Sequence, residues 1–248
     1  MSQRLINPAK QQGISKQVLR CWALLFLAVG VVGYSILEDM KSSYGTEFVM
    51  DTIGAIMELV QACAVPLFCF MLVDGIQHTK SYRNYFLRVL GLAVVCEIPF
   101  DLVYNNKVMD WSSQNPVLGF VVAMIMLYLV RSYAKKGIKT VLVNVLAVVM
   151  AILWGQFIKV KEGLPLILLV ATFWYSRKKK GVQIFCGAVV TCLCTTLSVG
   201  NLRYLMAPIS VVFIHFYNGE LGEDNKWINY GAFPVIMMAC WLIARFVV

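Results

Sequence analysis

Charged residues are scarce in this chain of 248 amino acids. Lysine, arginine, aspartate and glutamate make up 14% of it, while 60% is hydrophobic, and a soluble domain carries about 25% charge. The mean hydropathy is +0.73. So few charges cannot cover the surface of a water-soluble globule of this size, which excludes a soluble enzyme or a soluble binding module.

Polar breaks between the apolar runs are short, and the alternating pattern of a membrane β-barrel is lacking. Because about 20 apolar residues cross a bilayer as a helix, we predict an all-α, polytopic membrane bundle with about nine transmembrane helices, in a single domain over residues 1–248. The predicted spans are 21–37, 50–73, 85–104, 116–133, 140–158, 163–176, 182–199, 202–217 and 228–247. The sixth is short enough to be tilted, broken or re-entrant.

Positive charges are distributed unevenly between alternate gaps. If the N-terminus is cytoplasmic, the opposite side receives only Lys41, Lys107, Lys159, Lys161, Arg203 and Arg245 of the 22 lysines and arginines. The other 16 fall on the cytoplasmic side, as the positive-inside rule requires. This predicts an integral inner-membrane protein with a cytoplasmic N-terminus. Its first helix is expected to serve as its own uncleaved insertion signal.

The net charge of +9 lies in these short gaps, which favours the lipid bilayer and not nucleic acid as the partner. Histidine occurs only twice, and the eight cysteines all lie inside apolar runs. Cys192-x-Cys194 has no second cysteine pair and no nearby histidine, so no metal site is predicted. The cysteines are expected to pack as small hydrophobic residues.

Ionisable residues at bilayer depth cost about 2.5–3.5 kcal/mol each on insertion scales, so each one is a candidate site residue. Glu97 and Asp101 stand at i, i+4 on one helix face beside Pro99, where two carboxylates could share a proton. The alternative for Asp101 and Arg88 is a position near the interface, where each side chain reaches water. For Glu58 the alternative to a site role is a hydrogen bond from a neighbouring amide such as that of Gln61.

Several segments together resemble the TraX family. The first is the run from Pro66 to Lys80, PLFCFMLVDGIQHTK, and the second begins at Tyr85 and continues through CEIPFDL at 96–102. Gln114-Asn115 and the segment FYNGELG at 216–222 follow in the family's order. The continuous match over 66–102 is specific, and the matching segments extend over most of the chain.

The resemblance implies an integral inner-membrane acetyltransferase, acyltransferase-3-like in fold, that N-acetylates a conjugative pilin or another membrane peptide. Acetyl-CoA would be its co-substrate, with no cofactor permanently bound. The chain departs from the family at the usual Asp-His of the first span, which falls on Gly30 and Val31. It also departs at the family's C-terminal histidine, which falls on Ile236, and at an arginine that falls on Ala62.

In a chain with these departures, His78 is the predicted general base, because it is the only histidine in the best-matched segment. Asp74, four residues earlier, would orient its ring if the helix continues that far. Glu97 is the third predicted catalytic residue. The predicted contacts of the CoA phosphates are Lys80, Arg83 and Arg88, and the predicted substrate-binding residues are Asp101, Asn115, His215 and Asn218.

Two other functions remain open at this point. A catalytically degenerate relative could serve as a membrane partner in conjugation, pilus or peptide-export assembly. A small-solute transporter could use Glu58 and Glu97 in its binding site, but it would be expected to show inverted repeats, and none is visible.

Overall fold

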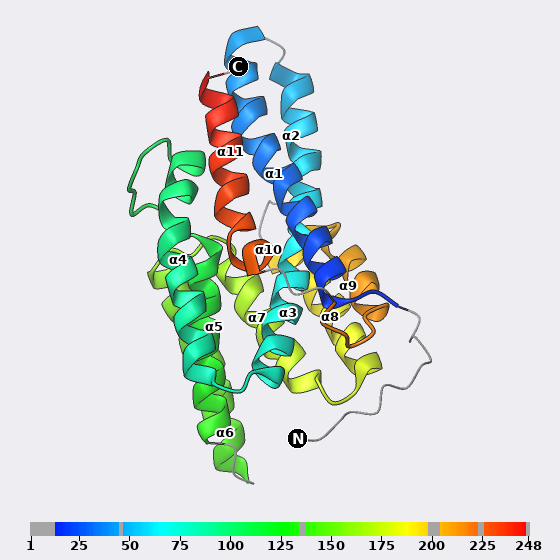
Figure 1. The fold of residues 1–248 in the computed structure, drawn as a ribbon. Coiled ribbons are helices and arrows are strands. Elements are labelled where there is room, and N and C mark those ends of the chain that lie inside the picture. The colour runs from blue at the N-terminus through cyan, green and yellow to red at the C-terminus, as the bar shows by residue number, and fades with distance from the viewer. Residues whose placement is uncertain (1–12, 45–46, 134–136, 198–203, 223–225, 247–248) are drawn as a thin grey trace.

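A computed structural model describes residues 13–44, 47–133, 137–197, 204–222 and 226–246. Within these residues helices are the only regular secondary structure, apart from two isolated β-bridges (Figure 1). The helices are α1 (Lys16–Tyr44), α2 (Glu47–Ala62), α3 (Ala64–His78), α4 (Tyr82–Tyr104), α5 (Pro116–Ser132), α6 (Ile138–Phe157), α7 (Gly163–Ser176), α8 (Lys180–Leu197), α9 (Ala207–His215), α10 (Lys226–Tyr230) and α11 (Ala232–Phe246). The predicted all-α class is confirmed.

Helix α3 lies at the centre, where it packs against α1, α7 and α9. Helices α4, α5 and α6 stand together on one side, and α1, α2 and α11 extend away from the centre on another (Figure 1). The core is apolar and formed mainly by α3, α5 and α7, with Leu67, Met124 and Ile167 among its fully buried side chains. The cysteines of the described residues are free, and five of the eight are buried as packing residues.

The structure does not confirm nine spans. Among the described residues, three helical stretches are long and apolar enough to cross a membrane: Lys16–Leu37, Phe48–His78 and Ile138–Phe157. Four shorter apolar helices are α5, α7, the stretch Lys180–Thr195 and α11. In the described part of the eighth predicted span the α-helix is the nine-residue α9, about 14 Å long, against about 30 Å of hydrocarbon. The described residues therefore support a helical membrane protein and do not confirm the predicted number of crossing helices.

Helix boundaries also differ from prediction. The second predicted span is a helical path of 31 residues that is interrupted at Cys63, between α2 and α3. The ninth is interrupted at Gly231, between α10 and α11. The seventh and eighth predicted spans are separated only by Gly200-Asn201, and this predicted tight hairpin lies outside the described residues. By contrast, α7 has the bounds predicted for the short sixth span.

Helix α6 carries exposed apolar side chains along most of its length. They are Ile138, Val141, Leu142, Val145, Leu146, Val149, Met150, Leu153, Trp154 and Phe157. A surface of this kind suits hydrocarbon and not water, because it would otherwise expose a large continuous apolar patch. We therefore assign α6 to the lipid-facing side of the bundle.

The start of α1 is tied to the segment that follows α9. The backbone N–H groups of Lys16 and Gln17 donate to the carbonyl oxygens of Glu220 and Leu221, at 2.8 and 3.2 Å. These are N–H groups that the first turn of a helix cannot satisfy itself. Gly222 has φ +72°, and a Cβ there would lie 2.6 Å from Oγ of Ser15. Only glycine allows the chain to pass so close to α1.

Candidate functional site

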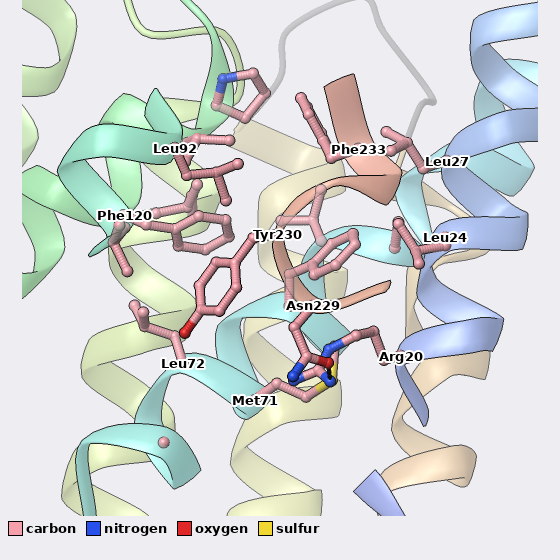
Figure 2. Close-up of a pocket in the computed structure, with 18 of the residues that line it drawn as sticks. Arg20, Leu24, Leu27, Met71, Leu72, Leu92, Phe120, Asn229, Tyr230 and Phe233 are labelled. Carbon is pink, nitrogen blue, oxygen red and sulfur yellow. Dashed lines mark hydrogen bonds between the residues drawn. The ribbon is translucent and has the colours of Figure 1, made fainter. Parts of the chain in front are cut away.

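A cavity of about 480 Å³ runs between α1, α3, α4 and the short α10 (Figure 2). On α4 its lining extends from Tyr85 to Tyr104, which is about 28 Å along a helix. The middle is apolar, with Leu24, Leu72 and Phe120 in its walls, and polar side chains gather towards both ends. A long apolar cavity with polar groups at its ends suits a ligand with an extended apolar part.

At the first end Lys16 and Asp74 form a buried ion pair. The Nζ atom of Lys16 lies 2.7 Å from Oδ2 of Asp74, and both residues are 7% exposed. The hydroxyl of Tyr217 donates to the same carboxylate oxygen at 3.4 Å. Burial and the neighbouring Asp74 charge raise the pKa of Tyr217 far above its usual value, so this hydroxyl keeps its proton. The carboxylate of Asp74 is thus held by donors from two other parts of the chain.

His78 lies beside the same carboxylate. Helix α3 continues to His78, as the predicted pairing with Asp74 required, and Nδ1 is 3.3 Å from Oδ1 of Asp74. The same nitrogen lies 2.8 Å from the carbonyl oxygen of Asp74. Because a carbonyl can only accept, Nδ1 carries the proton of the neutral ring, and Nε2 has the free lone pair. The imidazole lines the cavity and is largely exposed.

Three further polar residues line this end of the cavity. Arg20, one turn after Lys16 on α1, donates a hydrogen bond from Nη1 to Oδ1 of Asn229, and another to Oε1 of Gln17 at 2.9 Å. Tyr230, the next residue on α10, extends into the cavity with its hydroxyl towards Leu72 (Figure 2). The lining of the first end therefore combines an imidazole and two cationic side chains, and the Asp74 carboxylate contacts two of these groups, Lys16 and His78.

The other end of the cavity is built around Tyr104. Its hydroxyl accepts a hydrogen bond from Nε2 of Gln61 at 3.1 Å, and the Lys161 ammonium lies 3.1 Å from its ring centroid. Glu58 and Glu162 also line this end. Gln61 thus contacts Tyr104, a residue that sequence reasoning did not connect with it.

Glu97 and Asn115 are brought together, although neither lines the cavity. The Asn115 amide donates to Oε2 of Glu97 and, at 3.0 Å, to the carbonyl oxygen of Ala93. Its Oδ1 accepts the N–H of Leu118 at 3.2 Å and so caps α5. Oε1 of Glu97 is buried and has no hydrogen-bond partner among the residues that the structure describes. The pair links α4 to the start of α5, and its predicted catalytic and binding roles stay predictions.

Asp101 is fully buried and organises the loop after α4. It accepts hydrogen bonds from Nδ2 of Asn105 at 3.0 Å and from the backbone N–H of Asp110 at 2.8 Å. It lines neither of the two cavities described here. The geometry thus gives Asp101 a loop-holding contact, and its predicted role in substrate binding stays a prediction.

His215 and Asn218 line a second, separate pocket beyond Asp74. The two histidines therefore line different pockets. Of the predicted phosphate contacts, Arg88 lines the long cavity, whereas Lys80 and Arg83 are exposed and line neither cavity. The structure thus brings together only Asp74 and His78 among the predicted catalytic residues.

Sequence reasoning missed the part played by Lys16, Arg20 and Tyr217. Lys16 and Arg20 were counted as flanking charges of the first span, and their spacing of four residues places both on one helix face. That spacing was a usable signal for a polar face on α1. No sequence signal pairs Tyr217 with Asp74, because the two are 143 residues apart.

The position aligned with the family's first-span aspartate is a packing contact in this chain. A Cβ on Gly30 would lie 2.3 Å from Cβ of Gln61, so α1 and α2 approach closely here. Val31, at the aligned histidine, is fully buried. A polar pair at these positions would need a different spacing of the two helices.

Comparison with known proteins matches residues 15–244 to the model of the TraX protein family. A curated relative, the probable fimbrial assembly protein FimC of serogroup H1 from Dichelobacter nodosus, is 23% identical, with 74% of this chain and 81% of the relative covered. No solved structure matches. With the family match extending from before α1 into α11, the chain belongs to the TraX protein family.

Proposed function

We propose that this protein is a membrane acyltransferase that acetylates the amino group of a pilin, a fimbrial subunit or another membrane peptide. The observation that carries the proposal is His78, which lines one end of the long cavity and has its Nδ1 atom 3.3 Å from Oδ1 of Asp74. Membership of the TraX family and the similarity to a protein named for fimbrial assembly support the choice of acceptor. Acetyl-CoA would be the donor.

In this reaction Nε2 of His78 accepts a proton as the acceptor amine attacks the thioester carbonyl. The new C–N bond forms, the C–S bond breaks, and the leaving thiolate takes a proton. Asp74 acts as a positioning residue, since its carbonyl oxygen and carboxylate both face Nδ1. Arg20 and Lys16 bring positive charge to the same end of the cavity, where it would stabilise the oxyanion.

We also propose that this end of the cavity faces the cytoplasm of a bacterial inner membrane. The basic turn Arg177–Lys180 contacts the segment after α9, since Nζ of Lys180 donates to the carbonyl oxygen of Tyr217 at 2.8 Å. Tyr217 in turn contacts Asp74. The basic turns thus gather where Lys16 and His78 lie, and the positive-inside rule places such turns in the cytoplasm.

The reaction is tested with the purified chain in an uncharged detergent, with labelled acetyl-CoA and a peptide bearing a free amino terminus. We expect label to reach the peptide, and His78→Ala to lower the rate by about 100-fold or more. Asn84→Ala, an exposed change on the next helix outside both cavities, is the matched control.

The second function is a non-catalytic partner in pilus or fimbrial assembly. It is favoured by the ion pair with Lys16, which already neutralises the charge that Asp74 would offer to His78. CoA binding without transfer by the unmodified chain would support this role and contradict the acyltransferase. Equal rates for the unmodified chain and His78→Ala would exclude His78 as the base.

A further inference from the structure

The second pocket has a volume of about 690 Å³ and lies between the end of α3, the α7–α8 turn and the segment after α9. Phe70 and Ile214 form part of its apolar wall. Its polar lining includes Gln77, Gln183 and Asn218. Each of these amide groups donates one hydrogen bond within the protein and has a second N–H to donate. The pocket is large enough for a phosphorylated headgroup or the phosphate end of a larger ligand.

Three basic side chains line this pocket: Arg177, Lys180 and His215. The Arg177 guanidinium lies 3.8 Å from the ring centroid of Trp174 and donates to the Trp174 carbonyl oxygen. The Lys180 ammonium is held 2.8 Å from the Tyr217 carbonyl oxygen. Both cations are therefore held in place by contacts with neighbouring groups of the protein.

The positive charge of this pocket is not balanced by its own lining. Asp74 is the single acidic residue among the described residues that line it, and its carboxylate is paired with Lys16. Burial and the nearby charge of Arg131 lower the pKa of Arg177, as expected where positive charges crowd together. An anion in the pocket would relieve this repulsion.

We propose that the pocket binds the phosphate group of an anionic ligand, supplied either by an acidic phospholipid headgroup or by a soluble phosphate compound. A guanidinium, an ammonium and amide donors around one space are the groups that recognise phosphate oxygens. The pocket is separate from the long cavity, and the site does not depend on the proposed acetyl transfer.

The experiment measures binding to the purified full chain in an uncharged detergent by calorimetry. One probe is inorganic pyrophosphate, and the other is a short-chain phosphatidylglycerol. We expect at least one probe to bind, and the double change Arg177→Gln with Lys180→Gln to weaken that binding at least about tenfold. Binding of the lipid alone identifies a headgroup site, and binding of pyrophosphate identifies a site for soluble phosphates.

The matched control is the double change Lys178→Gln with Lys179→Gln. It removes the same charge from the same basic run, but both residues are exposed and line neither cavity. We expect it to alter the affinity by less than about threefold. Failure of both probes to bind, or an equal loss in the control, would overturn the proposal, since an equal loss indicates diffuse attraction to the basic run.

Loss of Lys180 also removes its contact with the segment after α9, so folding is checked by thermal unfolding. If the double variant does not fold, Arg177→Gln and His215→Gln are measured singly. Each is expected to weaken binding at least about threefold. Unchanged affinity in both single variants would also overturn the site.

Discussion

The Lys16 ammonium and the Asp74 carboxylate lie 2.7 Å apart although 58 residues separate them in the sequence. Removal of one partner from a buried pair costs about 3–5 kcal/mol, because the other charge is left uncompensated. We expect Lys16→Met and Asp74→Asn each to lower the thermal stability in detergent strongly. The combined variant should lose at least about 1 kcal/mol less than the sum of the two.

The control for the lysine change is Lys139→Met, at an exposed position. It should unfold at nearly the same temperature as the unmodified chain. If the stability losses of the two single variants simply add in the combined variant, the two charges do not interact. That result would contradict the ion pair seen in the structure.

Gly30 sets the spacing between α1 and α2. Gly30→Ala would place a Cβ 2.3 Å from Cβ of Gln61, so we expect destabilisation of about 1–3 kcal/mol from overpacking. Gly54→Ala on α2 has nothing within 4 Å of the added atom, and should be neutral or stabilise by up to about 1 kcal/mol. The measurement is the midpoint temperature of thermal unfolding of each variant. Equal midpoints for Gly30→Ala and Gly54→Ala would refute close packing at Gly30.

Asn115 serves both as a helix cap and as the hydrogen-bond donor to Glu97. Asn115→Ala should cost about 2–3 kcal/mol, since the cap is lost and a partly buried carboxylate loses its donor. Glu97→Gln keeps an acceptor for the amide and should cost less than about 1 kcal/mol. If Glu97 is catalytic, Glu97→Gln abolishes acetyl transfer without the loss of stability expected for Asn115→Ala. This result would separate a catalytic role of Glu97 from a structural one.

The orientation is tested by cysteine labelling of intact cells with a maleimide that does not cross membranes, against the background of the native cysteines. Ser112→Cys, in the exposed loop after α4, should gain label, whereas Lys178→Cys, in the α7–α8 turn, should gain none until the cells are opened. The reverse pattern would place the N-terminus outside.

The loop after α4 should loosen in acid. A hydrogen bond from Lys107 and one from the N–H of Ser112 lower the pKa of Asp110 to about 2. Because the folded pKa is below the usual aspartate pKa of 3.8, this stabilisation is present above about pH 4 and is lost as the pH falls towards 2. As the pH falls from about 4 to about 2, the rate at which pepsin cleaves this loop in the unmodified chain should rise relative to the rate in the Asp110→Asn variant. A ratio of the two rates that does not change with pH would contradict the interaction.

Local relationships were predictable from the sequence because one helix holds both partners. The pairing of Asp74 with His78 followed from their spacing of four residues once α3 was known to reach His78. Contacts such as Lys16 with Asp74 depend on which helices pack together, and no pattern in the sequence specifies that. The predicted number of spans was not confirmed for a related reason. The apolar run at 202–217 does not distinguish a crossing helix from the short α9, whose Ile214 is buried against the protein core.

The position of α10 has a consequence for how the protein forms during synthesis. Ile228, Asn229 and Tyr230 complete a cavity whose other lining residues lie between Lys16 and Leu221 or on α11. A ribosome delivers these three residues after every lining residue between Lys16 and Leu221. Until then the apolar walls of the cavity are open on one side, so a chain that stops before α10 would insert most of its helices and still lack a closed binding chamber.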